Sequence, residues 1–355
     1  MVILTGGAGF IGSNTLTALN HIYGDDILLV DNVASTSKWK NLVGKSFWQY
    51  VHKTRLWSWL DQNIDRAVEA VVHLGACTDT MESDFDYLFE NNSSYSLNIW
   101  HICTERQIPL IYASSAATYG NGGDGFSDDH EKTDIYKPIN PYGYSKHLFD
   151  LWVLKQQETP PRWYGIKFFN VYGPGESHKG RMASVAHFAI PQALQSGKIR
   201  LFKSYREDCA DGEQRRDFIF VQDIVDLIVY FLDASPPNGL YNAGTGRSRS
   251  FNDLASAIFS ALNLPERIEY FDMPESIKDS YQYVTEADMS TLLATGCPFE
   301  PLSLEEGIAQ YVKWLQNEYK NYPPLACLMA RLLRYIHPHV SRYAQVDVPC
   351  GQTRI

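Results

Sequence analysis

A glycine-rich turn at the start of the chain constrains the possible fold more than any other feature. Residues 5–12 read TGGAGFIG, directly after the apolar run 2–4 and directly before an apolar helical pattern. Glycines at this spacing, between a strand and a helix, let the backbone approach a pyrophosphate closely, and the helix N-terminus offers free N–H groups. The turn therefore predicts a βαβ nucleotide-binding unit in which Gly6, Gly9 and Gly12 contact the ligand.

Short apolar runs alternate with helical patterns over the first half of the chain. We expect strands at 2–5, 27–30, 70–73, 110–113 and 164–168, with helices at 11–22 and 143–157. Strands separated by helical stretches are typical of a parallel sheet that is covered on both faces. The fold class that we predict is α/β, a Rossmann-type doubly wound parallel sheet with a smaller C-terminal α/β substrate lobe.

The pattern also suggests how the chain is divided. We expect residues 1–170 to form the nucleotide-binding domain, with segments around 215–245 returning to it, and residues 171–317 to form mainly the substrate lobe. After residue 174 we expect helices at 180–195 and 221–232, a strand at 199–202 and a loop at 203–216. Ser303 and Glu306 have the spacing of a capping box. The tail 318–355, which contains a Pro323–Pro324 break, has no role that the sequence reveals.

Composition excludes several classes of protein. The 355 residues carry a net charge of −10, which argues against a general nucleic-acid surface. The chain has no run of about 18 apolar residues and no basic N-terminal region before an apolar stretch, so we expect neither a membrane span nor a signal peptide. The six cysteines are scattered without C-x-x-C spacing. A reduced, cytoplasmic protein without a metal site is the interpretation that this pattern favours.

The second expected strand ends at Asp31, where an acid usually accepts hydrogen bonds from an adenosine ribose and favours NAD. Asn32, Lys38 and Lys53 follow, and a lysine near that ribose can hold a 2′-phosphate. From these residues alone both NAD and NADP remain open.

Tyr142 and Lys146 form a Tyr-x-x-x-Lys pair, and Ser115 precedes them. A free tyrosine titrates near ~10, which is too high for a base at neutral pH. A lysine ammonium one helical turn later lies on the same face and, together with a nicotinamide's positive charge, would favour tyrosinate. The three residues predict removal of a hydroxyl proton by Tyr142, with Ser115 holding the oxygen.

Four segments sharpen the comparison: 113–120 (ASSAATYG), 142–146 (YGYSK), 169–174 (FNVYGP) and 178–185 (HKGRMASV). With the glycine turn they resemble the extended short-chain dehydrogenase/reductase superfamily, and within it most closely the ADP-heptose 6-epimerase family. The resemblance covers residues 1 to about 317. It implies a cytoplasmic, homo-oligomeric enzyme that holds NADP and inverts carbon six of an ADP-heptose for lipopolysaccharide inner-core synthesis.

The resemblance also implies site residues. Positions that fall where the family contacts its cofactor are Phe10, Ile11, Asp31, Asn32, Lys38, Lys53, Leu74, Gly75, Ala76, Cys77, Thr78, Asn91, Lys146 and Val171. Positions that fall on the two acid/base groups are Tyr142 and Lys179. Positions that we assign to the substrate are Asn170, Arg181, Phe202, Lys203, Ser204, Tyr205, Arg216 and Tyr281. Arg181 replaces a residue that is often small in the family, and the order of His187 and Phe188 is reversed.

Carbon six of a heptose has no acidic C–H, so inversion requires oxidation to a ketone and return of hydride to the other face. Related dehydratases carry an Asp–Glu pair where this chain has Ala116 and Ala117, which argues against loss of water. A UDP-hexose 4-epimerase is the alternative within the fold. An NADP-binding regulator without catalysis is the alternative from another class, although such proteins usually lack the Tyr-x-x-x-Lys pair.

Overall fold

The computed structural model describes residues 1–278 and 281–321. By its internal contacts the chain divides into two units, Met1–Trp314 and Leu315–Ile355. Helix α11 (Leu304–Asn321) crosses this division. The predicted tail therefore lies outside the described residues from position 322 onward, as do Cys327 and Cys350.

Seven strands form the central sheet of the first unit. They are β1 (Val2–Thr5), β2 (Ile27–Asp31), β3 (Gln49–His52), β4 (Ala70–His73), β5 (Leu110–Ser115), β6 (Trp163–Phe168) and β11 (Gly239–Ala243). Their order is β11-β6-β5-β4-β1-β2-β3, and every neighbouring pair is parallel. The chain order reverses between β1 and β4, which is where open α/β sheets bind ligands beyond the carboxyl ends of the strands.

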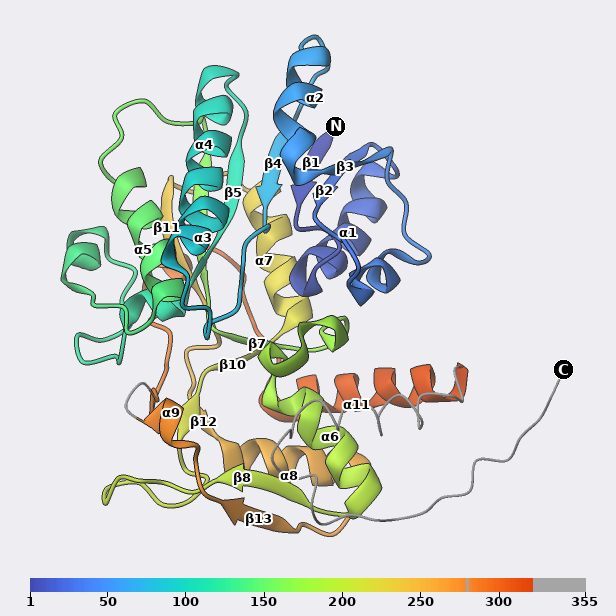
Figure 1. Ribbon diagram of the computed structural model, residues 1–355, viewed down its shortest axis with the longest axis vertical. Coiled ribbons are helices and arrows are strands. Elements are labelled where there is room, and N and C mark those ends of the chain that lie inside the picture. Colours follow the sequence, from blue (N-terminus) through green and yellow to red (C-terminus); the bar gives the residue numbers. More distant parts are fainter. Residues whose placement is uncertain (279–280, 322–355) are drawn as a thin grey trace, which may run out of the picture. The chain divides into compact units, whose positions relative to one another are not determined.

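Helices cover both faces of this sheet (Figure 1). On one face lie α1 (Phe10–Tyr23) and α7 (Val221–Asp233), whose Leu16 and Ile228 belong to one buried apolar cluster. On the other lie α2 (Leu56–Gln62), α4 (Tyr95–Glu105) and α5 (Pro141–Val153), whose Trp59, Trp100 and Phe149 belong to a second cluster. The predicted fold class, a doubly wound parallel sheet, is confirmed.

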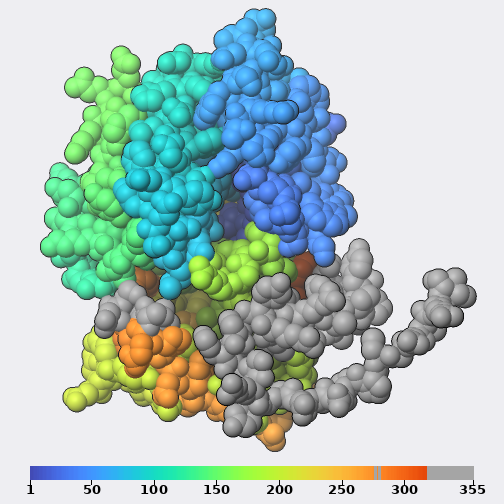
Figure 2. All heavy atoms as spheres, in the orientation of Figure 1, coloured from blue at the N-terminus to red at the C-terminus, as the bar shows by residue number. Residues whose placement is uncertain are grey.

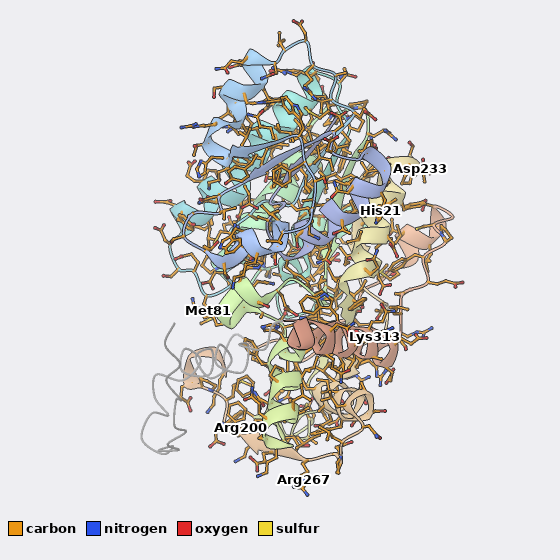
Figure 3. All side chains as sticks on the ribbon, turned by 90° about the vertical axis from the view of Figure 1, so that its right-hand side faces the viewer. His21, Met81, Arg200, Asp233, Arg267 and Lys313 are labelled. Atoms are coloured by element: carbon orange, nitrogen blue, oxygen red, sulfur yellow. The ribbon has the colours of Figure 1, made fainter. Side chains whose placement is uncertain are left out.

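The smaller lobe contains a parallel pair, β8 (Ile199–Phe202) and β13 (Ile268–Phe271), with α6 (Val185–Ser196) and α8 (Phe251–Leu262) packed together. The chain forms two further strand pairs: β7 (Asn170–Tyr172) with β10 (Phe218–Phe220), and β9 (Arg215–Arg216) with β12 (Arg249–Ser250). In Figure 3, Arg200 and Arg267 mark the outer end of this lobe, while His21 and Asp233 lie beside the large sheet. The chain returns to that sheet through α7 and β11. The domain boundaries themselves stay a prediction.

Shorter elements complete the described chain. They are η1 (Ser37–Leu42), η2 (Lys53–Arg55), α3 (Phe85–Leu88), the π-helical η3 (Phe89–Ser94), η4 (Ala116–Tyr119), η5 (His130–Ile135), η6 (Ser177–Met182), α9 (Glu275–Lys278) and α10 (Ser290–Ala294). No helix among the described residues is both long and apolar enough to cross a membrane.

Two expected helices differ from the structure by more than one residue at an end. The helix expected at 143–157 runs from Pro141 to Val153, because Asn140 caps the N–H of Gly143 and a proline suits the first turn. The helix expected at 180–195 was wrong at its start. Ser184 caps α6 by accepting the N–H of His187, and the preceding residues form η6. The Ser303–Glu306 capping box is confirmed by hydrogen bonds in both directions.

Candidate active site

The glycine turn connects β1 to α1 at the switch point of the sheet. Gly6 has a φ of +70°, and a Cβ there would lie 2.6 Å from the backbone nitrogen of Gly75, at the end of β4. A Cβ on Gly12 would lie 2.1 Å from the Gly6 carbonyl oxygen. Only glycine therefore fits either position. Since α1 begins at Phe10, the first N–H groups of the helix have no partner inside the helix and can meet a pyrophosphate. The turn thus fits a dinucleotide.

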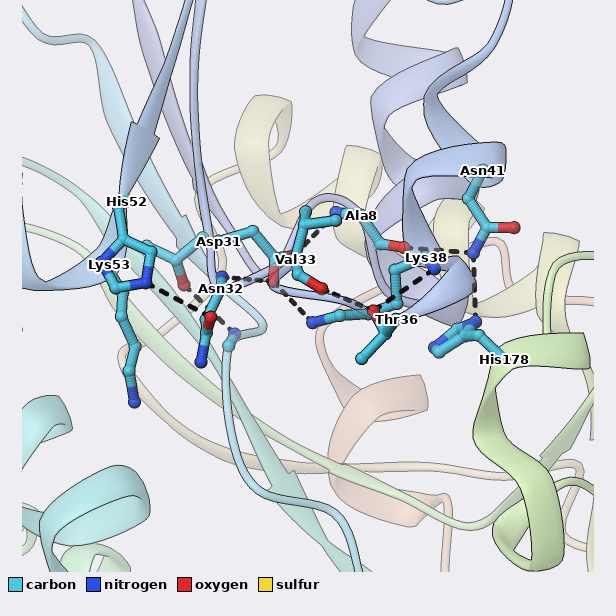
Figure 4. A network of polar contacts seen from close by, with 12 residues as sticks. Ala8, Asp31, Asn32, Val33, Thr36, Lys38, Asn41, His52, Lys53 and His178 are labelled. Carbon is cyan, nitrogen blue, oxygen red and sulfur yellow. Dashed lines mark hydrogen bonds and ion pairs between the residues drawn. The ribbon is translucent and has the colours of Figure 1, made fainter.

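Asp31 holds the turn from the end of β2. Its Oδ2 accepts the N–H of Ala8 at 2.8 Å, while its Oδ1 accepts the Nζ of Lys38 at 2.7 Å (Figure 4). The Asp31 side chain is 4% exposed, so this ion pair is largely shielded from water. The predicted cofactor residues Asp31 and Lys38 therefore lie together beside the turn.

Lys53 and its neighbours continue this edge of the site. The Lys53 ammonium hydrogen-bonds to Asn91 Oδ1. Figure 4 shows the second contact, in which Asn32 Oδ1 lies 3.2 Å from His52 Nε2. Burial lowers the pKa of Lys53, and the nearby charge of Lys38 lowers it further. Two ammonium groups therefore share this end of the sheet with one carboxylate, a charge balance that favours an additional anion.

Ser115, Tyr142 and Lys146 meet where β5 ends beside the first turns of α5. The Ser115 hydroxyl hydrogen-bonds to Tyr142. The Lys146 Nζ donates to the Ala113 carbonyl at 3.0 Å, two residues before Ser115 on the same strand. Tyr142 is 8% and Lys146 is 5% exposed. The structure thus places Tyr142 beside Ser115 and fastens Lys146 to the strand that carries Ser115, although sequence spacing related only Tyr142 and Lys146.

The ionisation of this group differs from the expectation. Burial raises the pKa of Tyr142, and the hydrogen bond from Ser115 only partly opposes this effect. Burial also lowers the pKa of Lys146 to about 8, against the attraction of Asp150. In the described structure Tyr142 is therefore a neutral phenol, and the ammonium group of Lys146, one helical turn later, keeps its proton at neutral pH. Tyrosinate needs further positive charge nearby.

Asn92, the neighbour of the predicted cofactor residue Asn91, was not among the predicted site residues, yet it holds the segment after β4 in place. Its amide pairs with the backbone of Cys77 in both directions, at 2.8 and 3.0 Å, and donates to Ser145 Oγ at 3.0 Å. It thereby fastens the predicted cofactor segment after β4 to α5, directly beside Lys146. Asn92 stands in the π-helical turn η3, and π-bulges are frequent at functional sites.

His73, at the end of β4, extends this network under the turn. Its Nδ1 lies 2.6 Å from Thr5 Oγ1, which also accepts the N–H of Gly75. Its Nε2 lies 3.0 Å from Ser96 Oγ. Because the Ser96 hydroxyl donates its proton to the Asn92 carbonyl, Nε2 carries the ring proton and donates to Ser96, and Nδ1 accepts the Thr5 hydroxyl proton. Burial lowers the pKa of His73 to about 3, so the ring stays neutral.

Lys179 lies on η6, close to the start of α1. Its Nζ is 5.4 Å from the centroid of the Phe10 ring. Burial lowers its pKa, and the buried Glu176 acts in the opposite direction. Glu176 itself accepts Ser184 N–H at 2.6 Å and Gly173 N–H at 3.2 Å. Lys179 is thus held next to the predicted cofactor site on a loop fixed by internal hydrogen bonds.

The predicted substrate residues form one aromatic and basic group and several separate contacts. The Arg216 guanidinium lies 5.0 Å from the Tyr281 ring, and the rings of Tyr281 and Phe202 are 6.4 Å apart. Asn170 Oδ1 accepts the Thr285 hydroxyl at 3.0 Å. The remaining members contact other partners: Lys203 pairs with Asp272, Ser204 N–H with Asp211, and Tyr205 N–H with Tyr283.

The two positions that depart from the resemblance have local partners. Arg181 forms an exposed ion pair of 2.7 Å with Asp79, on the loop after β4. His187 Nδ1 lies 2.9 Å from Tyr311 on α11, and burial lowers its pKa. His187 therefore joins two helices of the first unit, which is a structural contact.

The surface of the protein is hollowed between three segments that carry predicted site residues. Figure 2 shows a recess bounded by the blue N-terminal segment, the cyan segment after β4 and the yellow-green segment around η6. No group of three or more His, Cys, Asp and Glu side chains able to hold a metal occurs in the described part of the chain.

A parallel sheet with a glycine turn at its switch point, and a Ser–Tyr–Lys group beside it, define a nucleotide-binding α/β protein of the short-chain dehydrogenase/reductase type. Residues 2–244 match the NAD dependent epimerase/dehydratase family. The chain belongs to this family, so its cofactor is a nicotinamide dinucleotide and its substrate class is the nucleotide sugars.

Two relatives are similar over almost their whole length. ADP-L-glycero-D-manno-heptose-6-epimerase of Fusobacterium nucleatum is 45% identical over 323 residues, covering 88% of this chain and 97% of the relative. The protein of the same name from Nitratidesulfovibrio vulgaris is 47% identical over 314 residues, with the same coverage. The crystal structure of the Helicobacter pylori ADP-L-glycero-D-manno-heptose-6-epimerase superposes with a TM-score of 0.74 at 27% identity, covering 89% of this chain and 96% of that one.

Proposed function

We propose that this chain converts ADP-D-glycero-β-D-manno-heptose to ADP-L-glycero-β-D-manno-heptose by inverting carbon six through a transient 6-keto sugar. The observation that carries the proposal is the group Ser115, Tyr142 and Lys146 at the end of β5. The chain that carries this group aligns with 97% of the length of a relative that bears that epimerase name. Such a product would serve lipopolysaccharide inner-core synthesis.

The acid/base chemistry follows from where the side chains lie. Tyr142 takes the proton of the C6 hydroxyl while Ser115 holds the oxygen, and the Lys146 charge favours the phenolate. A bound nicotinamide supplies the acceptor and donor of the hydride. The proton needed when the inverted ketone is reduced comes from Lys179, which approaches from the η6 side. Ala116 and Ala117 offer no carboxyl group to expel water, so epimerisation is favoured over elimination.

We propose NADP as the cofactor. The ion pair between Lys38 and Asp31 neutralises the carboxylate that would otherwise repel a 2′-phosphate, and Lys53 adds a second ammonium group. Mass spectrometry of nucleotide extracted from the purified protein tests this assignment. Extraction of NAD alone would contradict it.

The function is tested by incubating the protein with ADP-D-glycero-β-D-manno-heptose and following the configuration at carbon six by NMR. We expect inversion by the wild type and a loss of at least ~10²-fold for Tyr142→Phe, the usual contribution of a positioned acid/base group. Tyr144→Phe is the matched control, because Tyr144 lies two residues away in α5 and its side chain is exposed. Wild-type protein that leaves the heptose unchanged would overturn the proposal.

The same assay separates the alternatives. The structure of a UDP-N-acetylglucosamine 4-epimerase from Methanobrevibacter ruminantium superposes with a TM-score of 0.74 at 26% identity, so a UDP-hexose 4-epimerase is the second candidate. It predicts interconversion of UDP-glucose and UDP-galactose instead. A regulator would bind the cofactor and convert neither sugar. Homo-oligomer formation and a cytoplasmic location stay predictions.

A further inference from the structure

Two asparagines, neither of them among the predicted site residues, connect the glycine turn to the loop after β7. Asn14, on α1, donates from Nδ2 to the Phe10 carbonyl at 2.9 Å and to the Pro174 carbonyl at 2.8 Å. Asn41, on η1, donates from Nδ2 to the Ala8 carbonyl at 3.1 Å and to the Gly175 carbonyl at 3.0 Å. Each amide therefore donates one hydrogen bond to the glycine turn or the start of α1 and the other to the loop after β7.

The donors in this arrangement are fully used. A primary amide has two N–H groups, and Asn41 donates one to the Ala8 carbonyl and the other to the Gly175 carbonyl. His178 Nδ1 lies 3.2 Å from the Asn41 nitrogen and 3.1 Å from the Gly175 oxygen. The tautomer that suits all of these contacts carries its proton on Nδ1 and donates it to the Gly175 oxygen, which accepts two hydrogens. Gly175, with a φ of +97°, turns the chain at this point.

The loop held in this way carries Lys179. The Lys179 N–H donates to the Glu176 carbonyl at 2.9 Å, and η6 begins at Ser177, two residues after the Gly175 carbonyl that Asn41 binds. The Lys179 ammonium then lies over the ring of Phe10, and the carbonyl of Phe10 is one of the groups that Asn14 binds. A short closed path of contacts therefore runs from the glycine turn through Asn14 to Pro174 and back through Lys179.

We propose that Asn14 and Asn41 are positioning residues that fasten the Lys179 loop to the nucleotide-binding turn, so that Lys179 keeps a fixed place relative to the cofactor site. The role given to Lys179 rests on the proposed function. Neither asparagine contacts the substrate residues, so their loss should act on kcat more than on KM. A shift of about 1 Å in a reacting group can reduce the rate by about 10²-fold.

The kinetic test uses Asn14→Ala and Asn41→Ala, with Asn20→Ala as the control. Asn20 lies on the same helix and makes the same double donation, to Gly24 and Ser46 carbonyls, away from the Lys179 loop. We expect kcat to fall by roughly 10- to 100-fold in the two test variants, with KM and cofactor Kd within about twofold of wild type. Asn20→Ala should keep the wild-type kcat.

Two further measurements separate positioning from a general loss of structure. In a Lys179→Met background, Asn14→Ala should cause little additional loss, because the group that it positions is already absent. Asn14→Asp is the second variant: it keeps the shape of the side chain but replaces both donors with an oxygen that repels the two carbonyls. If Asn14→Ala does not fold, the kcat of the folded Asn14→Asp protein is compared with that of the wild type instead, and an unchanged kcat contradicts the proposal.

A readout without substrate completes the design. The pH dependence of acetylation of Lys179 by acetic anhydride, followed by mass spectrometry, reports how shielded this amine is. We expect Lys179 to titrate at higher pH in Asn14→Ala and Asn41→Ala, because a released loop exposes it to water. If labelling and kcat are both unchanged in these variants, the proposal is wrong. If the wild type fails to epimerise the heptose, the proposed function fails and the labelling result still decides on positioning.

Discussion

The pair Asp150–Lys167 lies beneath the candidate catalytic group and offers a quantitative test of how the site is held. Lys167 Nζ, on β6, is 2.6 Å from Asp150 Oδ2, on α5, and both side chains are at most 1% exposed. Ser114 donates to Asp150 at 2.7 Å and Tyr112 at 3.2 Å. Lys167 also donates to Thr118 at 2.9 Å. The pair therefore joins α5 to the two strands beside it.

Asp150→Asn leaves the Lys167 charge buried without its counter-ion. Removal of one partner from a buried pair costs about 3–5 kcal/mol. At roughly 2 cal/mol/K of unfolding entropy per residue, a folded unit of about 310 residues loses ~1.5 °C of Tm per kcal/mol, so we expect a Tm lower by about 5–8 °C. Asp150→Leu combined with Lys167→Met removes both charges and should melt closer to wild type than either single variant.

The same substitution should alter the pH profile. Asp150 attracts the proton on Lys146, whose pKa burial lowers to about 8. Without the carboxylate the Lys146 pKa falls further, so the ammonium form is lost at lower pH and the alkaline limb of kcat moves toward neutrality. Calorimetry and pH–rate profiles measure the two effects. An Asp150→Asn protein with the Tm of the wild type and an unshifted alkaline limb in its profile of kcat against pH would refute this account.

Two more predictions concern the network under the turn. Because His73 is held neutral with a pKa of about 3, the unfolded chain binds a proton below about pH 6.5 that the fold excludes, so stability falls as the pH drops from about 6.5 toward 3. For an imidazole that titrates near 6.5 in the unfolded chain, the free energy of unfolding at pH 5 is ~2 kcal/mol lower than at neutral pH. Urea denaturation should show a smaller pH dependence of this free energy in His73→Gln. Asn92→Ala frees the backbone of Cys77 and should weaken cofactor binding in a fluorescence titration, whereas Asn63→Ala, whose amide only donates within α2 and its C-cap, should not. Equal cofactor affinity in Asn92→Ala and wild type would contradict the role assigned to Asn92.

Elements buried on both faces were predictable from the sequence. The strands expected at 2–5, 70–73 and 199–202 have these bounds in the structure, and in the first two every residue is buried, which is why their apolar runs are continuous. The edge strand β3 was not predicted. Its Gln49 and Tyr50 are exposed, so the segment carries no apolar run that could reveal it.

The choice between two neighbouring asparagines shows where local reasoning ends. Both Asn91 and Asn92 follow the same helix, and only the register of the π-helical turn decides which of them faces Cys77 and Ser145. An extra residue in one turn rotates the following side chains around the helix. Such an insertion depends on packing and has no simple sequence signal.

The sequence by itself determined the local chemistry: a glycine turn between a strand and a helix, and a tyrosine one turn before a lysine on α5. Both depend on spacings of a few residues, which helix and turn geometry fix directly. The tertiary structure alone decided the strand order, the meeting of Ser115 with Tyr142, and the contacts of Asn14 and Asn41 with a loop more than a hundred residues away. Ordinary side chains make these long-range hydrogen bonds, and nothing in their sequence spacing distinguishes them before the chain has folded.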